Sequence, residues 1–246
     1  MLQIFIPNHP RQVYGFLIIL ALFLGQLFIY KQLRKKKAPA KFALLYCLAS
    51  TILIYLFSIL VNLVVFHSFG LSSAGAGLGL ILCALLTEKF YKNKKLLSFL
   101  QIPQVEKIPE RSFISASVIA LPLMYSIAKL ACLSAGCCHG INYKGPFAIH
   151  YEWIKNSSFF PIQPLETIVF MGIFLLANKF KNGKNALYDT LGISIFIKLL
   201  LDFLRASHGT ELISTNQIVC LVALSAISLY ENALPAIKDL LSHHNH

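Results

Sequence analysis

Apolar residues are grouped along the chain into long stretches that alternate with short polar or basic segments. A helix needs about 20 apolar residues to cross a bilayer, and several of the stretches approach or reach that length. The alternation of apolar and polar positions that would indicate strands is not visible. The pattern therefore predicts an all-α polytopic membrane protein with about seven transmembrane helices, at Val13 to Tyr30, Phe42 to Phe66, Ala74 to Thr87, Phe113 to Ser134, Leu165 to Asn178, Ala186 to Leu204 and Leu212 to Leu229.

The composition supports the bilayer as the solvent of these helices. The chain has 246 residues, of which 57% are hydrophobic and 13% are charged, and its mean hydropathy is +0.67. A soluble domain has about 25% charged residues. Basic residues follow the first stretch and no small-residue cleavage site does, so we interpret it as a retained span and not as a signal peptide. Residues 1–246 then form a single transmembrane domain.

The distribution of the basic residues predicts the orientation of the chain, whose formal net charge is +12. Most of these residues fall in segment 31–41, in the connector 88–112 and in segment 179–184. The positive-inside rule places such segments in the cytoplasm, so the amino terminus is expected outside and the carboxyl terminus in the cytoplasm. Residues 136–164 then form an outer-face loop, rich in aromatic residues. Anionic lipid headgroups, and not nucleic acid, are the expected partners of the charge.

Four charged residues lie inside or at the end of predicted spans, where charge is costly and usually functional: Lys129, Lys198, Asp202 and Arg205. The last three have the spacing i, i+4, i+7, which predicts one helical face. Counted from the outer helix ends, Lys129 is roughly 13 Å deep and Lys198 roughly 10 Å deep. Two ammonium groups at one level, partly balanced by Asp202, would suit a phospholipid phosphate. A structural Lys–Asp pair, or lysines that reach outward without a ligand, is the alternative.

The segment Gly136-Cys137-Cys138-His139-Gly140 predicts a tight turn at the outer end of the fourth span. Its thiols or its imidazole could act as nucleophile, base or metal ligands. A zinc site would need further ligands, and Cys132 is the obvious candidate, but adjacent cysteines are an awkward chelate. We therefore expect no metal and no other cofactor. Small buried thiols at a helix end are the alternative interpretation.

Two further features lie at the starts of spans. Gln163 and Glu166 are three residues apart at the start of the fifth span, so an amide and a carboxylate share one face. A structural cap is the alternative there. Small residues around Gly75 open the third span, where they allow either close helix packing or approach to a lipid headgroup.

Several of these motifs, taken in order, resemble the prolipoprotein diacylglyceryl transferase family of bacterial inner membranes. The stretch Pro161-Ile162-Gln163-Pro164-Leu165-Glu166 is similar to the family's Pro-x-Gln-Leu-Tyr-Glu. The small-residue start of the third span, the turn from Gly136 to Gly140, the end of the sixth span and the stretch Ser214-Thr215-Asn216-Gln217 also correspond. Seven spans with the amino terminus outside are what the family would have.

The resemblance implies a reaction and a site. Phosphatidylglycerol, or another anionic phospholipid, would donate its diacylglyceryl group to the lipobox cysteine of a secreted preprotein, or to another thiol acceptor, in lipoprotein biosynthesis. The catalytic candidates are His139, Glu166 and Cys137. The candidates for binding the phosphate and headgroup are Lys129, Lys198, Asp202, Arg205, Gln163, Gly136, Gly140 and Gly75.

The sequence also departs from the family's pattern. Lys129 and Lys198 stand where the family carries arginines, and Ala74-Gly75-Ala76 stands where it has His-Gly-Gly. Two alternatives follow, a non-catalytic phospholipid-binding or assembly protein and a transferase with a changed acceptor. A small transporter would need polar residues that continue into the cytoplasmic half and paired, broken-helix repeats, so it ranks last.

Overall fold

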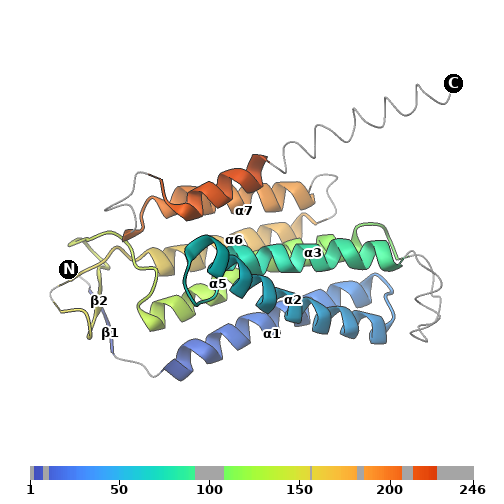
Figure 1. Cartoon of the computed structure of the whole chain (residues 1–246), viewed down its shortest axis with the longest axis horizontal. Coiled ribbons are helices and arrows are strands. Elements are labelled where there is room, and N and C mark those ends of the chain that lie inside the picture. Colours follow the sequence, from blue (N-terminus) through green and yellow to red (C-terminus); the bar gives the residue numbers. More distant parts are fainter. Residues whose placement is uncertain are drawn as a thin grey trace.

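A computed structural model describes residues 3–7, 11–91, 108–155, 157–181, 186–206 and 213–225. In these residues the chain forms seven helices, most of which run along the long axis of the molecule (Figure 1). They are α1 (Arg11–Lys35), α2 (Ala40–Phe66), α3 (Ser73–Tyr91), α5 (Ser112–Ala135), α6 (Ile162–Lys179), α7 (Ala186–Asp202) and a last helix, Thr215–Ser225.

Each predicted span coincides with one of these helices. By length and hydropathy four of them, α1, α2, α3 and α5, can cross a membrane, and the apolar helix Thr215–Ser225 is shorter. Part of the last predicted span, like residues 92–107 of the predicted connector, lies outside the described residues. The prediction of a helical, multi-pass membrane protein is confirmed, while seven complete spans and the orientation stay predictions.

The helical architecture is as expected, and two short strands that the sequence did not predict pair at one end of the bundle. β1 (Ile4–Ile6) runs parallel to β2 (Ile149–Tyr151), with Ile4 opposite Ile149. Strands of three residues are too short to show a periodic sequence pattern, so sequence analysis missed them. The pairing ties the start of the chain to the loop between α5 and α6. We call this end of the molecule the strand end.

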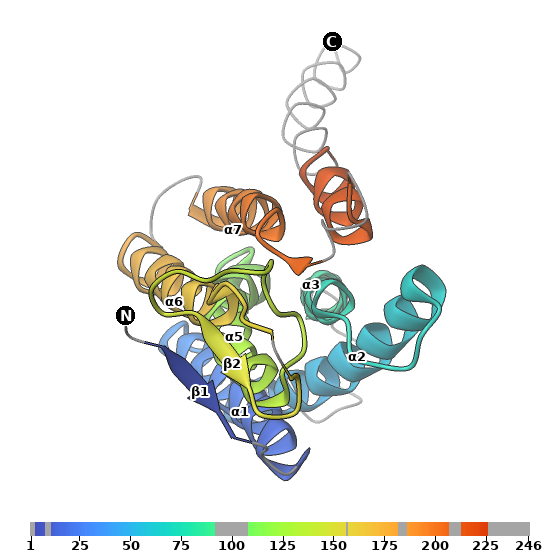
Figure 2. The ribbon, with the colours of Figure 1, turned by 90° about the vertical axis from the view of Figure 1, so that its left-hand side faces the viewer.

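Helix α5 is central to the bundle and packs against α1, α3, α6 and α7 (Figure 2). Its buried positions include several small residues, among them Ala116, Ser117, Ala120 and Ser126. Small side chains allow neighbouring helices to approach closely inside a membrane. The hydroxyls are satisfied by neighbours: Tyr46 of α2 and Ser117 share a hydrogen bond of 2.5 Å.

Helices α2 and α3 also make close contact, and glycine is required there. A Cβ atom on Gly75 would overlap the carbonyl oxygen of Phe57, and one on Gly79 would overlap that of Leu53. The absent side chain of Gly75 thus points at the backbone of α2. This contact is the helix packing that the sequence offered as one of two explanations for Gly75.

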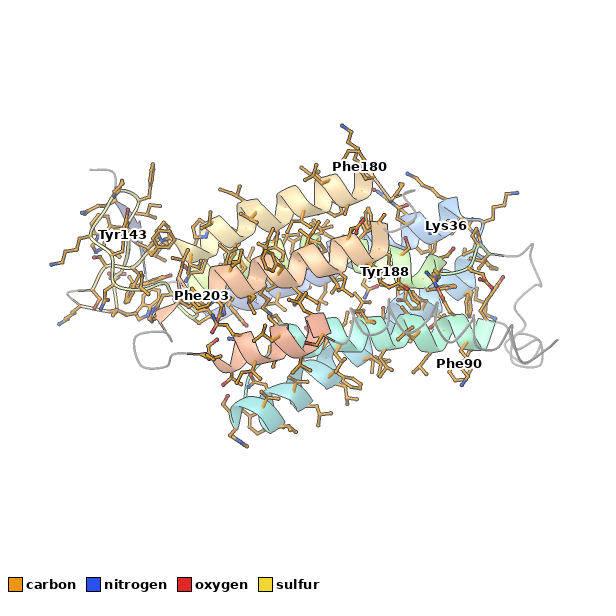
Figure 3. The ribbon with its side chains drawn as sticks, turned by 90° about the horizontal axis from the view of Figure 1, so that it is seen from above. Lys36, Phe90, Tyr143, Phe180, Tyr188 and Phe203 are labelled. Carbon is orange, nitrogen blue, oxygen red and sulfur yellow. The ribbon has the colours of Figure 1, made fainter. Side chains whose placement is uncertain are left out.

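The two ends of the bundle differ in charge. Figure 3 shows Tyr143 at the strand end, with Lys36 and Phe90 at the opposite end. The opposite end carries the basic last turns of α1, α3 and α6. There Glu88 accepts hydrogen bonds of 3.2 and 3.3 Å from the first free amides of α5, which otherwise lack partners in the helix.

Candidate functional site

A fully buried carboxylate, that of Glu166 on α6, is the centre of a polar cluster. Lys129 of α5 places its Nζ 2.9 Å from Oε2, and Arg205 places a terminal guanidinium nitrogen 2.6 Å from Oε1. The hydroxyl of Tyr125, one turn before Lys129, donates to Oε1 at 2.9 Å. Because burial of an unpaired charge is very costly, these contacts are what allow Glu166 to remain ionised inside the bundle.

Arg205 reaches the cluster by a route that the sequence did not predict. Its spacing from Lys198 suggested a shared helical face, but α7 ends at Asp202. Beyond it the amide of Arg205 bonds the carbonyl of Asp202, three residues back, at 3.0 Å, which tightens the turn. Arg205 then forms an antiparallel bridge with Gly140. The expectation that Arg205 shares the helical face of Lys198 and Asp202 is therefore wrong, whereas those two residues both lie on α7.

The bridge joins the turn after α5 to the segment after α7. The amide of Ile141 donates to the carbonyl of Leu204 at 3.0 Å, and the amide of Ala206 donates to that of His139 at 3.2 Å. A Cβ on Gly140 would lie 2.5 Å from the carbonyl oxygen of Phe160. Glycine is needed here so that three backbone segments can meet, and their meeting positions Arg205.

Asp202 supports Arg205 from the other side. One of its carboxylate oxygens lies 3.4 Å from Nε of Arg205, and the other accepts a hydrogen bond from the hydroxyl of Ser214. Ser214 is fixed in turn by Gln217, whose side-chain oxygen accepts from the Ser214 amide at 3.0 Å. Asp202 was expected to balance the two lysines, but the ion pair of Lys129 is with Glu166.

The two lysines face the same aromatic ring. Nζ of Lys129 lies 4.9 Å from the centroid of Tyr125, and Nζ of Lys198 lies 5.4 Å from it. Lys198 also donates to the hydroxyl of Ser73, at the start of α3, at 3.0 Å. Both ammonium groups therefore lie beside one aromatic ring, while their position at one level of the bundle stays a prediction.

Gln163 connects the cluster to the loop at the strand end. Its side-chain amide donates to the carbonyl of Cys137 and to the hydroxyl of Tyr151, both at 3.0 Å. Burial raises the pKa of Tyr151 to about 12, so its hydroxyl stays protonated. Gln163 is completely buried, and its Oε1 has no hydrogen-bond partner in the part of the chain that the structure describes.

Several of these residues, among them Gln163, Glu166 and Arg205, lie in the motifs on which the family resemblance rests. A family model described as prolipoprotein diacylglyceryl transferase matches residues 2–230, nearly the whole chain. The chain belongs to the prolipoprotein diacylglyceryl transferase family. No curated protein matches it. Membership makes it a multi-pass membrane protein of a transferase family with a lipid substrate.

In this prolipoprotein diacylglyceryl transferase family member the thiols gather at the end of α5. Gly136 ends the helix with a φ of 65°, and the amide of Cys137 returns to the carbonyl of Cys132 at 3.2 Å. Cys138 has a φ of 54°, a conformation that residues other than glycine adopt at a cost. The three sulfur atoms lie within 4.8 Å of one another.

Two candidates of the family resemblance have contacts away from Glu166. The ring of His139 lies 4.1 Å from that of Phe159, and its Nδ1 is 3.4 Å from the carbonyl of Gly140. Gly75 faces α2, as described above. A proton-accepting role for His139 and a headgroup role for Gly75 stay predictions.

Tyr125 and Ser73 were not among the predicted site residues, although both touch the charged residues of this transferase family member. A signal for Tyr125 was present, because it is four residues before Lys129 and shares its face of α5. Ser73 belongs to the stretch of small residues that opens the third span, but its hydroxyl was given no role of its own. Its contact with Lys198, 125 residues later in the chain, joins α3 to α7.

Proposed function

We propose that this protein transfers a diacylglyceryl group from phosphatidylglycerol to an acceptor thiol, at the outer face of the bacterial inner membrane. The basic residues at the end of the bundle opposite the strands support this orientation, because such residues favour the cytoplasmic side. The strand end, with the thiol turn and the loop from α5 to α6, then faces outward. The acceptor would be the lipobox cysteine of a secreted preprotein.

The observation that carries the proposal is that, among the residues the structure describes, there is an excess of one positive charge around Tyr125. Lys129, Lys198 and Arg205 contribute three positive charges, and Glu166 and Asp202 contribute two negative charges. The hydrogen bond of Lys198 goes to a neutral hydroxyl. The phosphodiester of a phospholipid carries one negative charge, so a single lipid headgroup beside Lys198 would balance the site.

The proposed reaction requires positive charge beside the phosphate that leaves. A thiolate sulfur would attack the terminal carbon of the diacylglyceryl group and form a sulfur–carbon bond. The bond from that carbon to the phosphate oxygen would break, and its electron pair would leave with glycerol phosphate. Fixed cations stabilise the charge that develops on this oxygen.

Glu166 is suited to positioning in this scheme. Both of its oxygens are occupied, one by Lys129 and one by Arg205 and Tyr125, so it holds the two cations in place. The proton of the acceptor thiol would go to another group. His139 and Cys137, both in the turn after α5, are the candidates from the sequence.

A transfer assay tests the proposal. Protein in nanodiscs is incubated with phosphatidylglycerol labelled in its diacylglyceryl group and with a lipobox peptide. We expect label on the peptide, its loss in Lys129→Ala and Lys198→Ala, and no change in Lys144→Ala, where the lysine is exposed at the strand end. Full transfer by the first two variants would overturn the assignment of the phosphate site.

Ala74 supports a second candidate function, phospholipid binding without catalysis or transfer to a different acceptor. It occupies the position where the family pattern has a histidine, and it follows Ser73, the partner of Lys198. Loss of a catalytic imidazole beside the phosphate site would leave a phospholipid-binding protein without turnover, or a transferase with a changed acceptor. Binding of phosphatidylglycerol without transfer to any thiol peptide is the result expected for the first of these.

A further inference from the structure

The three cysteines at the end of α5 have the arrangement of metal ligands. Their sulfur atoms lie within 4.8 Å of one another. Zinc binds thiolates at about 2.3 Å, so two sulfurs of a tetrahedral site are roughly 3.8 Å apart. Shifts of about 1 Å or less, within the range of cysteine rotamers, would close the set around one ion.

The structure removes the objection to adjacent cysteines as ligands. Gly136 and Cys138 both have positive φ values, 65° and 54°, so the chain reverses sharply between them. This reversal brings the thiols of Cys137 and Cys138 to the same side as that of Cys132, in the last turns of α5. The unfavourable backbone conformation at Cys138 indicates a position that the surrounding structure holds in place.

We propose that Cys132, Cys137 and Cys138 bind a zinc ion that keeps one open coordination position, and that the acceptor thiol binds at this position. The second part rests on the proposed function. In the described ranges no fourth histidine, cysteine or carboxylate joins the group. Three protein ligands and one open position are typical of catalytic zinc, whereas structural zinc has four protein ligands. Cys138 is exposed, so the open position faces the outside.

The zinc site would lie one helical turn from the phosphate site. On α5, Cys132 is three residues after Lys129, a rise of about 4.5 Å. On α6, Gln163 is three residues before Glu166, and its amide donates to the carbonyl of Cys137 at 3.0 Å. On both helices, therefore, the residue next to the thiols is three positions away from the residue of the phosphate site. The reacting carbon of the lipid is one oxygen atom away from the phosphorus, so a thiol on zinc would be near it while the cations hold the phosphate.

Zinc would activate the acceptor thiol without transfer of its proton to a side chain of the protein. A thiol that coordinates zinc loses its proton, here to solvent at the exposed side of Cys138. The electron pair of that sulfur then forms the bond to the lipid carbon, and the pair of the broken carbon–oxygen bond leaves with glycerol phosphate. The thioether product is a weak ligand, and water replaces it on the ion.

Titration with cobalt(II), a spectroscopic substitute for zinc, tests the site without an activity measurement. Reduced protein in nanodiscs should bind one equivalent, with the ultraviolet absorption of thiolate–cobalt bonds. Cys132→Ser and Cys137→Ser should each bind more than tenfold more weakly. Cys220→Ser, in the last helix, is the matched control and should bind as the wild type does. Absence of stoichiometric binding, or binding unchanged in Cys132→Ser, would overturn the proposal.

A second titration tests the open position. A lipobox peptide should change the visible spectrum of the bound cobalt, and the same peptide with serine in place of cysteine should not. An unchanged spectrum with both peptides would overturn thiol binding. Transfer by metal-free protein would overturn the zinc inference and leave the proposed function standing. A bound ion whose spectrum responds to the thiol, in a protein that transfers nothing, would overturn the proposed function and leave the site standing.

Discussion

Arg205 places its guanidinium 2.6 Å from the carboxylate of Glu166, although 39 residues separate the two in the sequence. The contact joins α6 to the segment after α7, and Lys129 adds α5 from the other side at 2.9 Å. Three parts of the chain thus share one buried charge. A buried group of charges of this kind contributes little net stability. Removal of one partner nevertheless destabilises the fold strongly, because the remaining charges stay buried without compensation.

Glu166→Gln should destabilise the protein by about 3 kcal/mol, because it leaves Lys129 and Arg205 close together without a carboxylate between them. A lower unfolding temperature in detergent, measured by the loss of helical circular dichroism, checks this. Glu152→Gln is the control, since Glu152 is exposed near the strand end. Equal unfolding temperatures for the two variants would contradict a central role for Glu166.

Gly140→Ala should move Arg205 and lower transfer more than tenfold, because the new methyl group would lie 2.5 Å from the carbonyl of Phe160 and 3.1 Å from that of Leu204. The transfer assay described above measures the loss. Gly172→Ala on α6 is a matched control, since a Cβ there meets nothing within 4 Å. If both variants transfer equally well, the bridge between Gly140 and Arg205 does not position the cation.

The parts of this site that sequence could predict are those that depend on one helix at a time. Apolar stretches located the helices because each span must be apolar over its own length. The spacing of Gln163 and Glu166 placed both on one face of α6, and both are completely buried. Lys129 was recognisable because a charged side chain inside a membrane span is energetically costly and therefore usually functional.

The parts that sequence could not predict depend on contacts between distant segments. Arg205 was predicted to share a helical face with Lys198 and Asp202, because periodicity does not show where a helix ends by tightening into a turn. Its bridge to Gly140 joins residues far apart in the chain, and the pairing of β1 with β2 does the same with strands of three residues. The grouping of the three thiols depended on positive φ values at Gly136 and Cys138, which the sequence suggested only for the glycine.

Lys198→Arg and Lys198→Ala should separate charge from shape at the phosphate site. Alanine removes a cation whose hydrogen bond goes to the neutral hydroxyl of Ser73, so KM for phosphatidylglycerol should rise at least tenfold. Arginine keeps the charge and can bind a phosphate through two parallel hydrogen bonds, so it should transfer at least as well as the wild type. Kinetics at several lipid concentrations measure both. An arginine variant as impaired as the alanine variant would mean that the hydrogen bond to Ser73, and not the charge, is what matters.

Gly75→Ala tests whether the start of α3 is used for packing. The added methyl group would overlap the carbonyl of Phe57, so α2 and α3 must separate, at a cost of about 2 kcal/mol of stability. Gly77→Ala is the matched control on the same helix, because its Cβ would make an ordinary contact of 3.8 Å with Leu121. We expect a lower unfolding temperature for Gly75→Ala alone, with phospholipid binding per folded molecule unchanged. Normal unfolding together with weaker phospholipid binding would instead assign Gly75 to the headgroup.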